Sequence, residues 1–186
     1  MSTSRDRVRQ ALSHQGSDRI PVDFGATAVT GIHCRAVEAL RKYYGLSYKP
    51  VKIVDTFQML GEVDRDLADA MGVDCIGVGG TRDIFDHDTE CMHEQVTPWG
   101  QKVLVPIQLD LTQDKEGDVY VYAGGDKNYP PSAVMPNGCF FINAIERQQP
   151  IDEDKLNPMD NLEEFNSITD EELDAYKKKV NEASAT

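Results

Sequence analysis

Four polar residues stand where the sequence pattern would let them contact a ligand: Asp23, His33, Arg82 and Asp83. Asp23 follows a short extended segment, where a carboxylate can hold a substrate group or close a turn. Arg82 and Asp83 follow a predicted strand, and they can meet a ligand there or pair with each other. His33 falls in the first turn of a predicted helix, where the helix dipole disfavours a protonated ring, so it can contact a ligand or simply begin the helix. We take these four as candidate substrate-binding residues and assign no catalytic group.

Histidine and cysteine also occur as close pairs, which raises the question of a metal site. His33 and Cys34 are adjacent, and Cys91 and His93 are separated by one residue. A structural zinc site needs four ligands, and such local pairs are common in loops and on helix surfaces. We therefore assign no metal ligand. The stretch 77–81 has the glycines of a phosphate loop but lacks its lysine, which favours a turn at the end of a strand.

The elements that must position these residues first alternate between helix and strand. The pattern predicts helices at 4–13, 31–44 and 58–71 and extended or β segments at 18–25, 51–54 and 73–78. Thr30 is expected to cap the second helix. A strand, a helix and a strand begin an α/β unit, in which a crossover helix joins parallel strands.

The pattern changes after Gly79 and Gly80. Residues 95–142 carry short β-like runs between turns rich in Asp, Gly and Pro, with strands expected at 102–107, 118–122 and 139–142. An acidic linker at 150–165 leads to a last helix, where Thr169 and Glu172 form a capping box. No strand follows that helix, so we expect the chain to stop within the α/β pattern.

Composition excludes several classes of partner. The net charge of −13 disfavours nucleic acid and anionic membrane surfaces, because both need clustered lysine and arginine. No apolar run reaches the roughly 18 residues of a membrane span, and the amino-terminal residues lack the apolar core of a secretory signal. The four scattered cysteines suit a reducing compartment. These features predict a cytoplasmic protein without a nucleic-acid or membrane partner.

Several stretches together resemble the uroporphyrinogen decarboxylase family. They are 5–8 with 18–22, 54–60 with 72–74, 131–141, and 168–173. Their order matches the family over nearly the whole chain, and the last two are similar to its decarboxylase-like branch, which includes corrinoid methyltransferases.

The resemblance implies the α/β fold of a TIM-type (β/α)8 barrel. Such barrels need about 250 residues and draw catalytic groups from several strands. The chain would then be one incomplete domain, residues 1–186, forming the amino-terminal part of the barrel with an antiparallel β meander inserted at about 95–142. The remainder of the barrel would be its first partner.

The family contains two activities. Its decarboxylases hold substrate carboxylates with arginines near the start and pyrrole N–H groups with a carboxylate after the first strand. The corresponding places here, 24–28 and 77–80, carry neither group. Its methyltransferases use zinc and a corrinoid protein, and the resemblance puts the zinc ligands beyond this chain.

The leading interpretation is therefore corrinoid-dependent methyl transfer. The longer protein would use zinc, a corrinoid protein as partner, and a tetrapyrrole or methyl-donor small molecule as ligand. The stretch 135–141 could line a flat tetrapyrrole or pack the β run. Two alternatives remain: uroporphyrinogen (tetrapyrrole) decarboxylation, and a catalytically inactive fragment that serves as an interaction piece.

Overall fold

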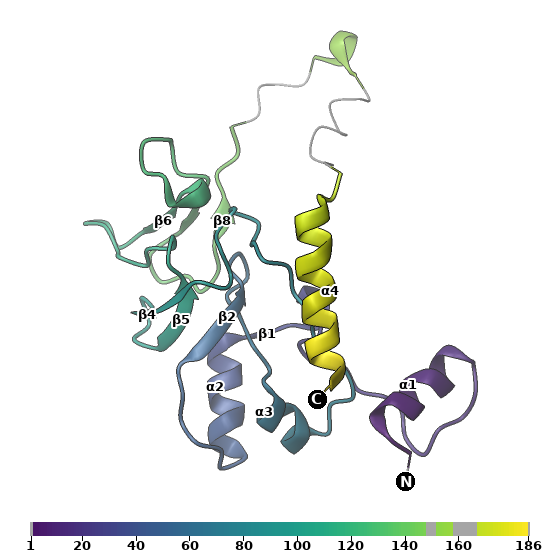
Figure 1. Ribbon diagram of the computed structural model, residues 1–186. Coiled ribbons are helices and arrows are strands. Elements are labelled where there is room, and N and C mark those ends of the chain that lie inside the picture. Colours follow the sequence, from purple (N-terminus) through teal and green to yellow (C-terminus); the bar gives the residue numbers. More distant parts are fainter. Residues whose placement is uncertain (1, 148–151, 158–166, 186) are drawn as a thin grey trace.

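The structure contains two small sheets with helices around them. The computed structural model describes residues 2–147, 152–157 and 167–185 (Figure 1). The larger sheet has the order β1-β3-β2-β5-β4 and the smaller the order β6-β7-β8. The strands are β1 (Ile32–His33), β2 (Val51–Asp55), β3 (Leu60–Gly61), β4 (Met92–Val96), β5 (Lys102–Pro106), β6 (Val119–Val121), β7 (Ala133–Met135) and β8 (Asn143–Ala144).

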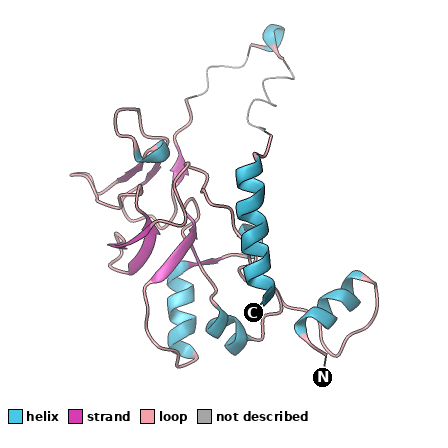
Figure 2. Ribbon diagram, viewed as in Figure 1, coloured by secondary structure: helices cyan, strands magenta, loops and turns pink. Residues whose placement is uncertain are grey.

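The helices lie outside these sheets (Figure 2). The described α-helices are α1 (Ser4–Leu12), α2 (Cys34–Tyr43), α3 (Arg65–Met71) and α4 (Asp170–Ala185), and the short 3-10 turns are η1 (Ala28–Thr30), η2 (Ala123–Gly125) and η3 (Glu153–Lys155). Helix α2 packs against the larger sheet through Cys34 and Val37, which are almost fully buried. Helix α1 stands apart beside the carboxyl end of α4 (Figure 1). Within the described ranges, no helix is both long and apolar enough to cross a membrane.

One apolar core joins the two sheets. Alternate residues of β5 point inward, so Val103 and Val105 are buried while Lys102 is exposed, as a strand with one covered face requires. Val119 and Val121 do the same in β6. These side chains form one cluster with the buried residues of β2 and β7. The two sheets therefore share a single core.

The expected partial (β/α)8 barrel is wrong, because no crossover helix follows β2. The Asp55 carboxylate accepts a hydrogen bond from the Gln58 amide at 2.7 Å, and Met59 takes a left-handed φ of 52°. The chain therefore reverses and returns as β3, antiparallel to β2. Only the end of the predicted 58–71 helix forms, as α3.

The expected strand at 73–78 is absent from both sheets of the described structure. The parallel neighbour of β2 is β5, with Val51 opposite Val103. The meander expected at 95–142 is also not a single insert. Strands β4 and β5 pair antiparallel inside the larger sheet, β6 to β8 form the smaller one, and the expected strand at 139–142 is a loop.

The helix predictions that rest on neighbouring residues were confirmed. The first helix is confirmed as α1, and the Thr169–Glu172 capping box is confirmed at the start of α4. The second helix is confirmed as α2, but its cap is His33 and not Thr30. Most of the predicted acidic linker at 150–165 lies outside the described residues.

A glycine in β3 provides a test of this packing. A Cβ on Gly61 would lie 2.5 Å from Cγ1 of Val51, 3.0 Å from Cγ2 of Val37 and 3.1 Å from the Cα of Cys34. We expect Gly61→Ala to lower the free energy of unfolding by about 1–3 kcal/mol, because the core must shift to admit the methyl group. Urea denaturation measures this, with Gly16→Ala as the matched control, since nothing lies within 4 Å of its Cβ position. Equal stability of the two variants would contradict the close packing of β3 on α2.

Candidate functional site

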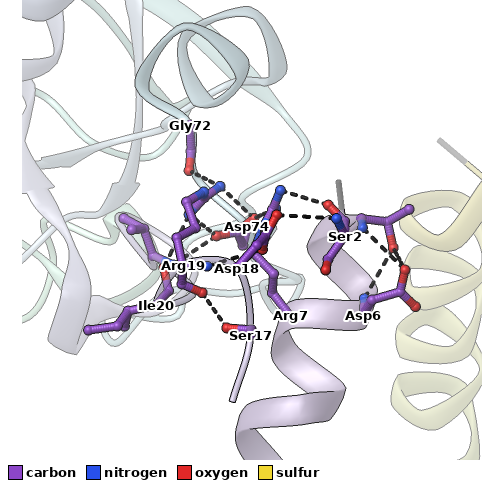
Figure 3. A network of polar contacts seen from close by, with 11 residues as sticks. Ser2, Asp6, Arg7, Ser17, Asp18, Arg19, Ile20, Gly72 and Asp74 are labelled. Carbon is purple, nitrogen blue, oxygen red and sulfur yellow. Dashed lines mark hydrogen bonds and ion pairs between the residues drawn. The ribbon is translucent and has the colours of Figure 1, made fainter. Parts of the chain in front are cut away.

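The first segments of the family resemblance meet at the buried carboxylate of Asp74 (Figure 3). Arg7 of α1 donates to its Oδ1 at 2.6 Å. Arg19 donates to both oxygens, at 2.6 and 2.9 Å, and the Val22 amide donates to Oδ2 at 2.9 Å. Three segments that are distant in the sequence are thus joined by one side chain with no exposed surface.

These contacts decide what Asp74 can do. Burial alone would raise the pKa of its carboxyl, but the Val22 amide and the side chains of Ser4, Arg19 and Arg7 together hold that pKa well below its usual range. Each oxygen accepts hydrogen bonds from at least two protein donors. The carboxylate therefore anchors α1 to the body of the protein and has no lone pair left for a substrate.

Asp83, one of the four candidate residues, is buried in a second polar cluster. Its Oδ2 accepts from the Thr56 hydroxyl at 2.5 Å and lies 3.1 Å from Nδ1 of His87. Its Oδ1 accepts from the amides of Phe85 and His87, both at 2.9 Å. The other ring nitrogen of His87, Nε2, lies 2.9 Å from the carbonyl oxygen of Tyr122.

This arrangement defines the protonation of His87. A carbonyl oxygen and a carboxylate both accept hydrogen bonds, so each ring nitrogen carries a proton and the ring is an imidazolium. Burial acts to lower the pKa of His87, but the contacts with Asp83 and the Tyr122 carbonyl outweigh it and raise that pKa above its usual 6.5. For Asp83, burial is outweighed by the donors His87 and Thr56, and its pKa falls below 3.8. The pair fixes the loop 81–89 in place.

Arg82 lies on the outer side of this loop, beside α4. Its Nη1 donates to the Asp86 carbonyl oxygen at 2.8 Å and forms an ion pair with Oδ1 of the same residue at 3.0 Å. The expected alternative of an Arg82–Asp83 surface pair is thus replaced by an Arg82–Asp86 pair. A groove of about 440 Å³ separates the 79–82 turn from α4, and Arg82 forms part of its wall.

Asp23 closes a turn. Its Oδ1 accepts from the Ala26 amide at 3.1 Å, and Gly25 takes a positive φ of 87°. The turn touches the start of the glycine-rich stretch, since a Cβ on Gly77 would lie 2.8 Å from the Ala26 carbonyl oxygen. The two places at which the chain departs from the decarboxylases therefore lie against each other.

His33 is the centre of an aromatic cluster. Its Nδ1 accepts from the Arg35 amide at 3.2 Å, which caps α2, so Nε2 carries the proton and donates to the Phe140 carbonyl at 3.1 Å. Its ring centroid lies 5.5 Å from that of Trp99 and 5.3 Å from that of Phe141. The Arg35 guanidinium lies 4.5 Å from the Phe140 ring centroid. Both phenylalanines are partly exposed, at 36% and 52%.

The four candidate residues do not form one site. Within the described part of the chain, no hydrogen bond or ion pair joins Asp23, His33 and Arg82, and Asp83 faces inward. Sequence reasoning missed three residues that position these sites. His87 pairs with Asp83, Trp99 contacts the His33 ring, and Asp74 binds Arg7 of α1. The motif Gly72-Val73-Asp74 was a signal for Asp74, but nothing local marks the other two.

Neither histidine–cysteine pair fits zinc. Burial raises the pKa of the Cys34 thiol to about 12, so it stays protonated, and both ring nitrogens of His33 have partners. Asp88 raises the pKa of Cys91, and Nε2 of His93 lies 3.3 Å from the Leu109 carbonyl. The described residues contain no group of three or more His, Cys, Asp or Glu side chains placed to hold a metal ion.

No protein-family model, no curated protein and no solved structure matches this chain.

The Asp74 network leads to a stability prediction. We expect Asp74→Asn to lower the free energy of unfolding by about 3 kcal/mol, because two guanidinium groups would lose the buried charge between them. Urea denaturation followed by circular dichroism measures this. The control is Asp18→Asn, a half-exposed partner of Arg7, which should cost much less. Equal losses would show that Asp74 is not the anchor.

The Asp83–His87 pair makes stability depend on pH in a defined window. Its contribution is complete between pH 3.8 and 6.5. It is lost as pH rises through the raised pKa of His87, and as pH falls through the lowered pKa of Asp83. We expect the wild-type protein to lose more unfolding free energy between pH 6.5 and 9 than the His87→Gln variant, in urea titrations at each pH. Parallel curves would contradict the buried imidazolium.

Proposed function

We propose that this chain is a uroporphyrinogen-decarboxylase-like protein that acts in corrinoid-dependent methyl transfer, and that it supplies a corrinoid-binding surface. The observation that carries the choice of branch is the contact between the Asp23–Ala26 turn and Gly77. A Cβ at Gly77 would lie 2.8 Å from the Ala26 carbonyl oxygen and 3.1 Å from that of Gly25. The space admits no side chain at 77, so no carboxylate can stand at that position.

That contact disfavours decarboxylation. A porphyrinogen carries many carboxylates that need bidentate cations, and its protonated intermediate needs a nearby anion. The resemblance implies that the family's arginines and carboxylate would stand in the stretches 24–28 and 77–80. Residues 24–28 offer no charge, and 77–80 are three glycines and a valine.

The network at Asp74 supports the membership in the family. Arg7, Arg19 and Asp74 come from three stretches that carry the resemblance, and both arginines donate directly to the Asp74 carboxylate. A chance similarity in three separate stretches gives no reason for them to meet. The support rests on these contacts and not on a barrel, which the fold excludes.

The aromatic cluster around His33 supports the binding role. The partly exposed rings of Phe140 and Phe141 suit contact with the apolar parts of a corrin macrocycle, and Arg35 suits the amide oxygens and the phosphate of its side chains. The Cys34 thiol beneath them is buried and protonated, so it is no nucleophile. The proposal therefore gives this chain the binding of the corrinoid and not the activation of a methyl acceptor.

Trp99 provides the test, because it is the only tryptophan of the chain and belongs to the cluster. We expect methylcobalamin to quench its fluorescence saturably, and Phe141→Ala and Arg35→Ala to weaken binding by about tenfold, the effect of losing roughly 1.4 kcal/mol of contact. The matched control is Phe24→Ala, a half-exposed phenylalanine on another loop. Free N-acetyltryptophanamide corrects for light absorbed by the corrinoid. Quenching no stronger than that of the free amide, or conversion of uroporphyrinogen by the chain, would overturn the proposal.

A further inference from the structure

We infer that the groove between the Gly79–Arg82 turn and α4 binds a small monocarboxylate with an apolar body. The groove is lined by different residues from the aromatic cluster, so this inference stands independently of the proposed corrinoid surface. Its volume of about 440 Å³ lies in the range of small-molecule sites, which combine apolar walls with a few convergent polar groups.

Helix α4 provides the apolar wall. Leu173 and Tyr176 lie nearly one turn apart on its groove side, and Ile168 precedes the helix on the same wall. These side chains are 40%, 49% and 76% exposed, so the protein itself leaves much of this wall uncovered. None of the described side chains of α4 is fully buried. An apolar ligand placed in the groove would gain contact with all three residues.

Two cations and one acid line the groove. Lys179 donates to the Gly80 carbonyl at 2.9 Å, and Arg82 stands on the turn itself. The acid is Glu172, whose carboxylate accepts from the amide of Thr169 at 2.9 Å and from its hydroxyl at 3.0 Å. That carboxylate is engaged in capping α4. Lys179 is also paired with Glu90, at 3.2 Å between Nζ and Oε1. Arg82 is therefore the cation of the groove that keeps unused donors, which matches a single carboxylate.

Arg82 has donors left for that carboxylate. Both of its protein contacts, to the carbonyl and the carboxylate of Asp86, use Nη1. Within the described part of the chain, Nε and Nη2 donate to no protein acceptor. Together these two form the edge of a guanidinium that binds a carboxylate through two parallel hydrogen bonds. The exposed Arg82–Asp86 pair costs a ligand little, because such pairs contribute only weakly.

The turn is held in place before any ligand arrives. The Thr89 amide donates to the Thr81 carbonyl at 2.9 Å, and the Thr89 hydroxyl donates to the Gly80 carbonyl at 3.0 Å. The buried pair of Asp83 and His87 fixes the loop from within. Gly79 adds no side chain to the groove, and nothing lies within 4 Å of its Cβ position. A wall that is already ordered loses little entropy on binding.

The experiment uses phenylacetate as the probe, with benzyl alcohol as a neutral molecule of similar body and inorganic phosphate as an anion without one. Amide chemical shifts in ¹H–¹⁵N NMR spectra report both affinity and place. We expect phenylacetate to shift the amides of Gly79 and Gly80 saturably, with at least tenfold weaker binding of benzyl alcohol and of phosphate.

Variants separate the two walls. Arg82→Gln should weaken phenylacetate binding at least tenfold, and Tyr176→Ala should weaken phenylacetate and benzyl alcohol alike. The matched control is Lys177→Gln, whose ammonium pairs with Asp174 on α4 and does not line the groove. It should leave binding unchanged. Equal binding of benzyl alcohol, preference for phosphate, or an equal loss in the Lys177 variant would overturn the inference.

Discussion

Burying an imidazolium beside a carboxylate is costly unless nearly every donor and acceptor of both groups is satisfied. Asp83 and His87 meet that condition with partners from three parts of the chain: Thr56 after β2, the amides of the loop itself, and the Tyr122 carbonyl after β6. The pair therefore ties the larger sheet to the smaller one through a loop that has no regular secondary structure. The position of the 79–82 turn, and with it the groove, depends on the same contacts.

The Asp74 network acts in the same way at the amino-terminal end. Helix α1 buries none of its side chains, so apolar packing does not hold it. The ion pairs of Arg7 and Arg19 with one fully buried carboxylate take that role. The residues that carry the family resemblance in this region therefore have a structural role, which is to hold α1 in place. Arg7, Arg19 and Asp74 attach a helix to the body of the protein, and binding chemistry must be sought elsewhere in the chain.

What could be predicted from the sequence was set by the range of the interactions. Thr169 and Glu172 are only three positions apart, so the capping-box pattern alone located the start of α4. The crossover unit after β2 was wrong because apolar spacing over 58–71 cannot reveal that Asp55 closes a turn and that Met59 adopts a left-handed conformation. The candidate site was the least predictable part, because its residues meet across long stretches of sequence. His33 was singled out for its helix-start position, but its partner Phe140 lies 107 residues away, and no local pattern connects them.

The parallel pairing of β2 with β5 has a consequence for how the protein is made. As the chain emerges during synthesis, β2 can form its hairpin with β3 at once, because only a short turn separates them. Its other edge stays open until β4 and β5 have appeared and Val51 can meet Val103. Pairing strands so far apart in the sequence slows folding, because the chain loses the entropy of loop closure before any contact forms. An unpaired strand edge is meanwhile a template for association with other chains. The nascent protein is therefore most vulnerable to aggregation in the interval between β3 and β5, well before either proposed binding surface exists.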